Sequence, residues 1–372
     1  MDKINKLILC LLPNQICNFK CEYCYISQLE QWNNPENMKY SPEHMAKCLS
    51  KERVGGTALI NLTGEGETFL VKEINEIIMA FLKEGHYVEV VTNGTVSKKI
   101  KELLELEPEL LAHLFFKISF HYKELKEKGM LEQFFETVND IKNSAASFTL
   151  ELMAHDGIEN EIDNIQKVCI ENIGAVCQVT VGRNDKKKEK ALLSNHSVAE
   201  YRKIWNTFDS PMFNFKMDVL SVKRKEFCYA GAWSLSVNLY TGEAQPCYWQ
   251  PYNQNIFEDP SKPIVFKPVG KMCTLPYCYN AHAHMTWGLI PELETPTYCS
   301  MRNRKCTDGS EWVKAECKTF FESKLCDTNT EYGIREKSLY TVTFPFLYVK
   351  WMTRDIKSNF ERVKRFIKRS FK

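Results

Sequence analysis

Residues 6–24 read KLILCLLPNQICNFKCEYC, and this stretch decides the fold. It opens with the apolar run 6–12, which has the length and the aliphatic composition of a buried strand. A Pro-Asn pair ends the run. Three cysteines follow, Cys17, Cys21 and Cys24, separated by three and then two residues. The stretch therefore predicts a strand that leads directly into a cysteine-rich loop.

The same alternation of short strand-like runs and longer helical patterns continues to about residue 183. Such alternation is typical of βα units that build a parallel sheet, and units of roughly 30 residues fit a right-handed barrel or an open sheet. We therefore expect an α/β fold with a TIM-like partial (β/α)6 barrel. The expected strands are Lys6–Leu12, Ala58–Thr63, Tyr87–Thr92, Phe115–Phe120, Ser147–Met153 and Val176–Val181.

The pattern changes after the sixth expected strand. The charged run 184–190 is interpreted as a solvated loop, and a helix is expected over Ser197–Phe208. Beyond about residue 221 the helical periodicity fades, while proline, glycine and cysteine recur. We therefore expect a core domain over 1–220, a small α+β domain over 221–338, and a basic amphipathic tail over 339–372.

The composition is that of an ordinary globular protein. The 372 residues are 44% hydrophobic and 26% charged, and the net charge of +2 gives no reason to expect a nucleic-acid partner. The first apolar run is too short for a secretion signal, and no uncharged apolar stretch approaches the ~20 residues that span a bilayer. We therefore expect a cytoplasmic protein.

Fifteen cysteines are more than a reduced compartment would use for disulfides, so metal binding is the favoured interpretation. Eight of them lie outside any metal-binding spacing. Four sit inside apolar or periodic segments and are expected to be small buried hydrophobes, and four later ones are expected to be ordinary thiols. In order, they are Cys10, Cys48, Cys169 and Cys177, then Cys299, Cys306, Cys317 and Cys326.

The first cysteine group has the spacing CxxxCxxC, at Cys17, Cys21 and Cys24. Three thiolates on one short loop can hold three corners of a 4Fe-4S cubane. The fourth iron then lacks a protein ligand, and an open metal position is where substrate chemistry occurs. A zinc site is the alternative, although structural zinc normally takes four protein ligands. With an aromatic residue at Tyr23, the loop resembles that of the radical S-adenosylmethionine (radical SAM) superfamily.

This resemblance implies that S-adenosylmethionine (SAM) chelates the open iron through its amino and carboxylate groups, with Tyr23 near the adenine. It also implies that a low-potential electron donor, of the flavodoxin or ferredoxin type, reduces the cluster. SAM is then cleaved to methionine and a 5′-deoxyadenosyl radical, which abstracts hydrogen from an unactivated carbon. In such enzymes the cofactor supplies the hard chemistry, while the protein orients the substrate.

A turn after the second expected strand, Gly64-Glu65-Gly66-Glu67, resembles the GGE motif of the same family. Glycines let the backbone approach a ligand closely, and a carboxylate pairs with an ammonium group. The resemblance implies that Glu67, with Glu65 as second choice, binds the SAM ammonium. The family usually has proline where Thr68 stands, a departure that concerns the stiffness of the loop.

Further candidates follow other expected strands, because chemistry gathers at the C-terminal ends of the strands in a βα barrel. Thr92, Asn93 and Ser119 lie where relatives place residues near the ribose or methionine end of SAM. Arg183 is a candidate for binding a SAM or substrate carboxylate. His121 is the candidate catalytic residue, as a general base or hydrogen-bond donor. Structural roles are the alternative for Ser119, His121 and Arg183.

The second cysteine group begins at Cys228. Alternation over 234–240 and a turn after it predict a β-hairpin, which would bring Cys228 and Cys247 together. Cys273 and Cys278 complete a four-cysteine site. The arrangement resembles the SPASM or Twitch extension of radical SAM enzymes, which implies a second, auxiliary 4Fe-4S cluster.

The match to the SPASM pattern is partial, because four residues separate the last cysteine pair and the later cysteines fall at other spacings. One auxiliary cluster is therefore expected rather than two. A structural zinc site is the alternative for these four thiols. His282 and His284 are interpreted as ligands, substrate contacts or polar loop residues.

The C-terminal residues 349–372 are strongly basic, and their apolar residues recur at steps of three and four, as on one face of a helix. Such a helix can lie on an anionic membrane, with Trp351 and Phe360 as anchors, which would place the protein at the inner face of the membrane. Packing on the protein's own core is the alternative.

The predicted function is radical abstraction of hydrogen from a sugar-like or other small, glycan or lipid-linked substrate, with the auxiliary cluster assisting oxidation. The early position of Cys17 favours a small substrate, because peptide-modifying relatives often carry an N-terminal leader-binding domain. The alternatives are a peptide or protein maturase, of the RiPP or sulfatase-maturase type, and an epimerase. A non-catalytic zinc or redox-binding protein is the alternative from another class.

Overall fold

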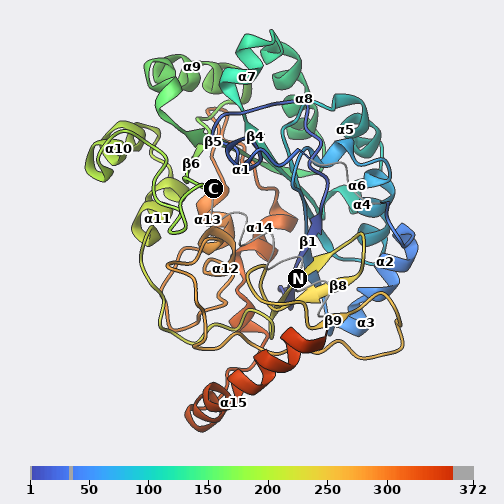
Figure 1. Cartoon of the computed structure of the whole chain (residues 1–372). Helices are drawn as coiled ribbons and strands as arrows, with labels where there is room; N and C mark the ends of the chain where they lie inside the picture. Colours follow the sequence, from blue (N-terminus) through green and yellow to red (C-terminus); the bar gives the residue numbers. More distant parts are fainter. Residues whose placement is uncertain (1, 33–36, 355–372) are drawn as a thin grey trace.

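The computed structural model describes residues 2–32 and 37–354, and its first half alternates strands and helices as predicted (Figure 1). The six predicted strands are confirmed. They are β1 (Lys6–Leu12), β2 (Ala58–Gly64), β3 (Tyr87–Thr92), β4 (Leu114–Phe120), β5 (Ser147–Ala154) and β6 (Gln178–Val181). The helices of this half are α1 (Tyr25–Leu29), α2 (Pro42–Cys48), α3 (Lys51–Val54), α4 (Ile74–Lys83), α5 (Ser97–Leu104), α6 (Pro108–Leu111), α7 (Tyr122–Glu127), α8 (Leu131–Asn143) and α9 (Ile162–Ile173).

The strands form one nine-stranded sheet in the order β6-β5-β4-β3-β2-β1-β7-β8-β9. The first six pair in parallel with their neighbours, and β7 (Ser234–Asn238) pairs in parallel with β1. Two short antiparallel strands, β8 (Glu243–Gln245) and β9 (Gln254–Asn255), follow. Because β6 and β9 are the two ends of the order, the described sheet is open, as expected for a partial barrel.

The predicted hairpin is confirmed, since β7 and β8 are antiparallel neighbours. Its first strand, however, joins the core sheet beside β1 instead of standing apart. The burial of β7 explains this position, because Ser234 to Val237 are buried and only Asn238 is partly exposed. A strand covered on both faces belongs inside a sheet.

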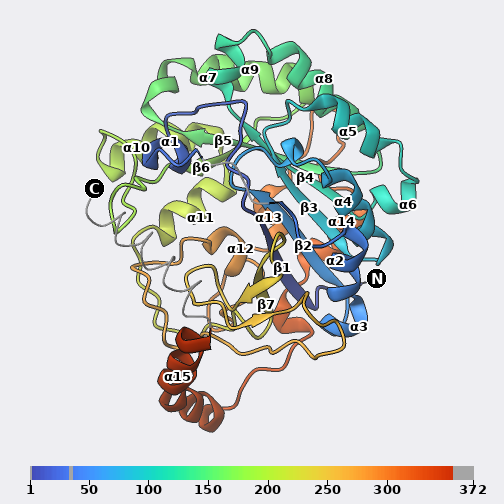
Figure 2. The same ribbon diagram turned by 45° about the vertical axis from the view of Figure 1, so that its right-hand side comes forward.

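The two faces of the sheet are covered by different parts of the chain (Figure 2). On the outer face, residues such as Ile60 and Val90 form a core with α4, α5 and α8. On the inner face, Leu59, Tyr87 and Phe115 pack with residues of the C-terminal third. Successive residues of a strand point to opposite faces, so each strand contributes to both cores.

The inner face is covered by α12 (Ala281–His284), α13 (Tyr298–Arg302) and α14 (Ala315–Glu322). The Phe320 ring stacks on Tyr87 with 3.8 Å between centroids. The Arg302 Nε donates to Glu151 Oε1 at 3.1 Å, and both side chains are buried. Polar residues inside otherwise apolar strands are therefore satisfied by the C-terminal third.

Between the two halves lie α10 (Val198–Trp205) and α11 (Pro211–Val219). The helix predicted over 197–208 is confirmed as α10 followed by a short 3-10 turn, and Ser197 with Glu200 forms a capping box at its start. Helix α11 packs against β6, α12 and α13, which brings its side chains to the inner side of the open sheet.

The last described helix, α15 (Ile334–Arg354), projects from the body of the protein (Figure 1). One side of it contacts the protein, since the Tyr340 hydroxyl donates to Pro268 O at 2.5 Å and Phe344 is buried. Trp351, expected as a membrane anchor, is only 6% exposed and packs edge-to-face on Phe344.

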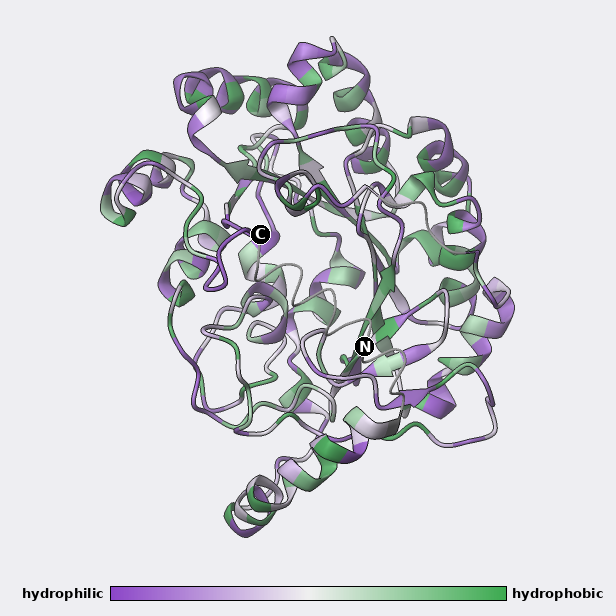
Figure 3. Ribbon diagram, viewed as in Figure 1, coloured by the Kyte–Doolittle hydropathy of each residue, from purple (hydrophilic) through white to green (hydrophobic). Residues whose placement is uncertain are grey.

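Four apolar residues of α15, which we call the apolar stripe, recur at steps of three and four and lie exposed. They are Leu339, Val342, Phe346 and Val349. Figure 3 shows hydrophobic stretches along the ribbon of this projecting helix. No helix among residues 2–32 and 37–354 has the length and apolar character needed to cross a bilayer. Residues 355–372, which hold most of the predicted basic tail including Phe360, lie outside the described residues.

Candidate active site

The first cysteine group lies on the loop after β1, as predicted. Cys24 is the N-cap residue of α1, and its N–H donates to Cys21 O at 3.1 Å. The Phe19 N–H donates to Cys17 Sγ at 3.4 Å, while the Phe19 ring is buried in the outer core. The local fold therefore holds three thiols on one short, anchored loop.

The glycine- and glutamate-rich turn after β2 is clamped against this loop by three backbone hydrogen bonds. Glu65 N–H donates to Leu12 O at 3.1 Å, Gly66 N–H to Asn14 O at 2.5 Å, and Glu67 N–H to Ile16 O at 2.9 Å. A Cβ atom on Gly66 would lie 2.1 Å from Ile16 O. Only glycine allows so close an approach, so Gly66 joins the turn to the cysteine loop.

Glu67, the first choice for binding the SAM ammonium, is 2% exposed and accepts three hydrogen bonds from its own chain. Its Oε1 accepts from Phe69 N at 3.0 Å and Thr92 Oγ1 at 2.6 Å, and its Oε2 accepts from Asn93 N at 2.7 Å. Burial raises the pKa of Glu67, and these donors oppose that rise. Its carboxylate thus ties the end of β2 to the end of β3.

Glu65, the second choice, is only partly buried. Its Oε2 accepts from Gln15 Nε2 at 2.5 Å. Of the two glutamates, Glu65 therefore has the more accessible carboxylate. Gly64, at the end of β2, donates its N–H to Thr68 Oγ1 at 3.0 Å, so Thr68 stabilises the turn at the position where the family usually has proline.

The end of β3 reaches the cysteine loop through Asn93. Its Nδ2 lies 2.8 Å from Asn18 Oδ1 and 4.0 Å from Cys17 Sγ. Thr92, besides donating to Glu67, accepts from Gly94 N at 3.0 Å. These contacts place both residues beside the first cysteine group.

His121 follows β4 and contacts the cysteine loop. Its Nδ1 lies 2.6 Å from the Tyr23 hydroxyl and 3.4 Å from Cys21 Sγ. Burial, with His155 adding to it, lowers the pKa of His121 to about 4. The Nδ1 of a neutral imidazole can accept a hydrogen bond from the Tyr23 hydroxyl. His121 therefore anchors the cysteine loop to the end of β4. Ser119 is partly buried and stands in register with Glu151 of β5.

The first cysteine group fits a 4Fe-4S cluster with one open iron. Burial raises the pKa of Cys17 to about 11 and the pKa of Cys21 to about 12. The charge of a Cys24 thiolate adds to both rises. Buried thiols that are hard to ionise by themselves become thiolates when a metal supplies positive charge. Three such ligands match the cluster that the loop predicts.

The second cysteine group is assembled by the β7–β8 hairpin and a later loop. Cys228 and Gly270 exchange backbone hydrogen bonds of 3.1 and 2.9 Å. At Gly231, with φ of +95°, a Cβ would lie 2.1 Å from Lys267 O and 2.5 Å from Pro246 Cβ. This close approach brings the residue before Cys247 beside the segment that follows Cys228.

The four predicted thiols of this group influence one another. Burial raises the pKa of Cys278, and Cys228, Cys247 and Cys273 add to that rise. A tetrahedral zinc site, with Zn–S bonds of ~2.3 Å, needs sulfurs about 3.8 Å apart. Among the described residues, no three cysteine sulfurs all lie within 4.8 Å of one another.

A path of hydrogen bonds joins the two cysteine groups. Gln28 Nε2 donates to Tyr23 O at 2.8 Å and to Arg183 O at 3.0 Å. Arg183 Nη1 donates to Tyr279 O at 2.8 Å, and Tyr279 adjoins Cys278. Arg183, predicted from its place after β6, thus lies between the groups.

Several side chains near this path were missed by sequence reasoning. Lys117 and Glu151 are charged residues inside apolar strands, and that contrast could have marked them. Gln28 lies in a short helix of mixed residues and carries no such signal, whereas Lys216 stands between the apolar Phe215 and Met217 of α11.

Burial confirms the prediction for four of the other eight cysteines. The four expected buried hydrophobes are fully buried, Cys306 donates to Ile173 O, and Cys317 donates to Ala112 O. No disulfide joins any of the fifteen cysteines, all of which fall in the described ranges.

The two histidines that follow Cys278 are both shielded from solvent. His284 is buried and His282 is partly buried, and burial lowers the pKa of both.

Comparisons with known proteins agree with the motifs. A model of the radical SAM superfamily matches residues 11–168. The chain is 25% identical over 270 residues to the antilisterial bacteriocin subtilosin biosynthesis protein AlbA of Bacillus subtilis (strain 168). That alignment covers 68% of this chain and 58% of AlbA, so the chain matches little more than half of that relative.

Solved structures with a similar fold include SuiB of Streptococcus suis bound to S-adenosylmethionine, at 13% identity and a TM-score of 0.46, covering 69% of this chain and 64% of SuiB. Another is anSMEcpe with bound AdoMet, at 16% identity and a TM-score of 0.49, covering 92% of this chain and 98% of that one. The matched segment, 11–168, contains the cysteine loop and the turn clamped to it. Residues 11–168 of this chain therefore form a radical SAM domain.

Proposed function

We propose that this radical SAM enzyme oxidises a peptide substrate placed between two iron-sulfur clusters. Cys17, Cys21 and Cys24 would hold the SAM-binding cluster. The second cysteine group, Cys228, Cys247, Cys273 and Cys278, would hold an auxiliary 4Fe-4S cluster. When bound, these groups supply electron transfer and the radical chemistry that removes hydrogen from carbon.

The observation that carries this proposal is the hydrogen-bond path from Tyr23 through Gln28 and Arg183 to Tyr279. This path connects the two cysteine groups, although they are more than 200 residues apart in sequence. A substrate between them would have one group on each side. That arrangement suits removal of hydrogen from the substrate beside the first cysteine group and acceptance of an electron by the second.

The chain's own residues position the cofactors. Glu65 is the carboxylate that we assign to the SAM ammonium, because it is more accessible than Glu67. Glu67 positions Asn93, whose side chain lies beside Cys17. His121 positions Tyr23 and Cys21 through its Nδ1, and its catalytic role stays a prediction.

A peptide substrate is favoured by the relative AlbA, which is named for the biosynthesis of the bacteriocin subtilosin. This favours the maturase alternative over the small-substrate interpretation that the position of Cys17 suggested. A flavodoxin- or ferredoxin-type protein is the proposed electron donor.

A lipid-linked or glycan substrate is the second candidate, and the apolar stripe of α15 favours it. Phe346 is 78% exposed and Val342 is 71% exposed. Apolar residues exposed along one helix face, followed in sequence by a basic segment, suit contact with an anionic membrane surface. Such contact would bring the enzyme to a membrane-borne substrate.

The proposed function is tested on protein purified and reconstituted without oxygen. Iron per chain and 5′-deoxyadenosine formed from SAM under dithionite are measured for the wild type and for Cys17→Ala/Cys21→Ala/Cys24→Ala. We expect about eight irons in the wild type and about four in the triple variant, since each four-iron cluster is bound separately. Only the wild type should form 5′-deoxyadenosine.

Cys326→Ser is the matched control, because Cys326 is partly buried but belongs to neither group. It should keep both the iron and the SAM cleavage of the wild type. Bound zinc in place of iron, with no SAM cleavage, would refute the proposal. The substrate class is tested by supplying a precursor peptide, for which a mass change that depends on SAM is expected.

A further inference from the structure

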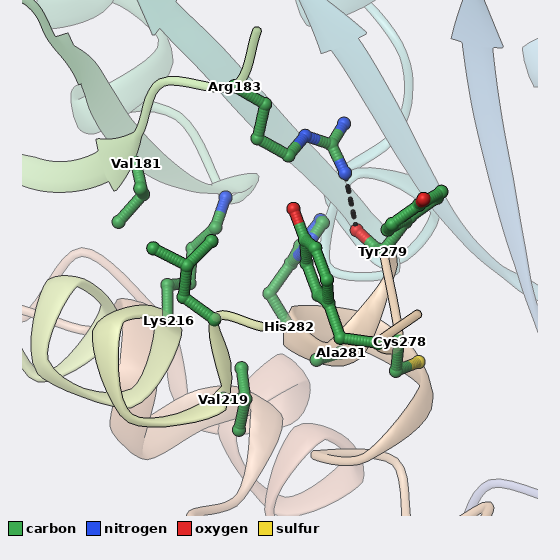
Figure 4. A pocket seen from close by; sticks show the side chains of 10 residues that line it. Val181, Arg183, Lys216, Val219, Cys278, Tyr279, Ala281 and His282 are labelled. Atoms are coloured by element: carbon green, nitrogen blue, oxygen red, sulfur yellow. Dashed lines mark hydrogen bonds between the residues drawn. The ribbon is translucent and has the colours of Figure 1, made fainter. Parts of the chain in front are cut away.

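A pocket opens between β6, α11 and the turn that follows Cys278 (Figure 4). It is a small cavity of about 20 Å³ that is partly open to solvent. Its lining includes Arg183, Lys216 and His282, with Tyr277 and Tyr279 on the wall. Figure 4 shows Arg183 and Lys216 extending toward the same space from opposite elements. The pocket therefore lies beside the second cysteine group and is lined by basic side chains.

These basic groups are bonded only to neutral partners. Lys216 donates to the hydroxyl of Thr180, and Arg183 donates to the carbonyl of Tyr279. Neither Arg183 nor Lys216 forms a salt bridge within the part of the chain that the structure describes. The pocket thus contains two basic side chains without a paired carboxylate.

The nearby carboxylates are engaged elsewhere. Glu151, within electrostatic reach of Lys216, pairs with Arg302. Asp185, within reach of Arg183, pairs with Lys190. Neither carboxylate forms a salt bridge with Lys216 or Arg183.

Burial, followed by the charge of Arg183, lowers the pKa of Lys216 to about 7. Lys117 and Arg302 add to the same effect. In addition, the buried His282 Nδ1 has no hydrogen-bond partner among the described residues. Buried cations and unpartnered nitrogen atoms are costly to maintain unless an anion joins them.

We infer that this pocket binds an anionic group of the substrate, a carboxylate or a phosphoryl group, through Lys216 and Arg183. The inference rests on the proposed function, because the pocket lies on the path between the two cysteine groups. A guanidinium binds planar or tetrahedral oxyanions through several N–H groups, and an ammonium adds a point charge. The anion would fix the substrate at the end next to Cys278.

The inference is tested by thermal unfolding of the reconstituted full chain with saturating SAM, so that the SAM carboxylate is not the anion observed. Sodium phosphate or sodium acetate replaces sodium chloride at constant ionic strength. At ten times the dissociation constant, the bound anion should raise the melting temperature of the wild type by about 2 °C. A shift with acetate identifies a carboxylate site, and a shift with phosphate alone identifies a phosphoryl site.

Lys216→Met should abolish the shift, and Lys216→Arg should restore it. Lys203→Met, which removes an exposed lysine from α10, is the matched control and should keep it. Arg183→Gln provides a second test if Lys216→Met does not fold. The inference is overturned if no anion shifts the wild type, if Lys216→Met keeps the shift, or if Lys203→Met loses it.

The same samples separate this inference from the proposed function. Failure of the wild type to form 5′-deoxyadenosine would refute the proposed function, while an anion-dependent shift could still be measured. Loss of the shift with SAM cleavage intact in the wild type would refute the anion pocket alone.

Discussion

The two glutamates of the turn after β2 are expected to respond very differently to the same substitution. Glu67→Gln replaces one acceptor oxygen with a donor in a site where three donors converge, from Phe69, Thr92 and Asn93. At least one buried donor then loses its acceptor. A buried unsatisfied donor costs about 1–3 kcal/mol, and bonds to a charged group cost more, so we expect a loss of about 2–4 kcal/mol.

For a chain of 372 residues this loss corresponds to a fall in melting temperature of about 3–5 °C, taking ~2.1 cal/mol/K of unfolding entropy per residue. Glu65→Gln is the matched control, because Glu65 is partly exposed and accepts a single side-chain hydrogen bond. It should change the melting temperature by about 1 °C or less. If Glu65 binds the SAM ammonium, the same variant should weaken SAM binding about tenfold or more.

Circular dichroism during heating measures the first effect, and equilibrium dialysis with labelled SAM measures the second. Thr92→Val completes a double-mutant cycle, since it removes one of the three donors. The costs of Glu67→Gln and Thr92→Val should not add, because both remove the same bond. A Glu67→Gln protein that melts within 1 °C of the wild type would refute the bracing role of this carboxylate.

Three further predictions concern other parts of the molecule. Cys228→Ala/Cys247→Ala should lower the iron content by about four per chain and leave the SAM-binding cluster in place, as judged by iron analysis and by SAM cleavage. Burial lowers the pKa of His86 to about 4, against 6.5 when exposed. Between these values the unfolded chain binds the extra proton, so the free energy of unfolding should fall by about 2 kcal/mol from pH 7 to pH 5. His86→Gln can keep both hydrogen bonds of the ring. In urea unfolding at pH 7 and pH 5 this variant should lack the fall in the free energy of unfolding that His86 causes, and an unchanged fall would contradict the prediction. Phe346→Asp should reduce the fraction of protein that floats with anionic liposomes at least several-fold, whereas an equal fraction for both proteins, or none for either, would count against membrane contact.

Local sequence patterns were sufficient for the radical SAM half of the molecule. A strand such as Lys6–Leu12 is marked by its own composition, and the cysteine spacing after it depends only on neighbouring residues. The hairpin after Cys228 was likewise predictable, because alternation and turn residues act over a few positions. Features of this kind can be predicted because the interactions that stabilise them are local.

Other features depend on contacts between distant segments. The pairing of β7 with β1 joins residues more than 220 positions apart, and no local pattern specifies which strand edge receives β7. The inward turn of Glu67 depends on donors from the end of β3, and the GGE resemblance alone favoured a contact with SAM. Burial and hydrogen-bond partners of these kinds arise only when the chain is packed.

Local patterns in the amino-acid sequence were enough to predict the α/β class, the six parallel strands, the two groups of cysteines and the resemblance to radical SAM enzymes. The tertiary structure decided that Arg183 and Gln28 connect those groups, and that Lys216 faces Arg183 across a pocket. Side-chain charge is visible in a sequence, but its neutralisation depends on which distant groups the fold brings near it. Two basic side chains without a paired carboxylate therefore become apparent only after the sheet, α11 and the turn after Cys278 have been packed together.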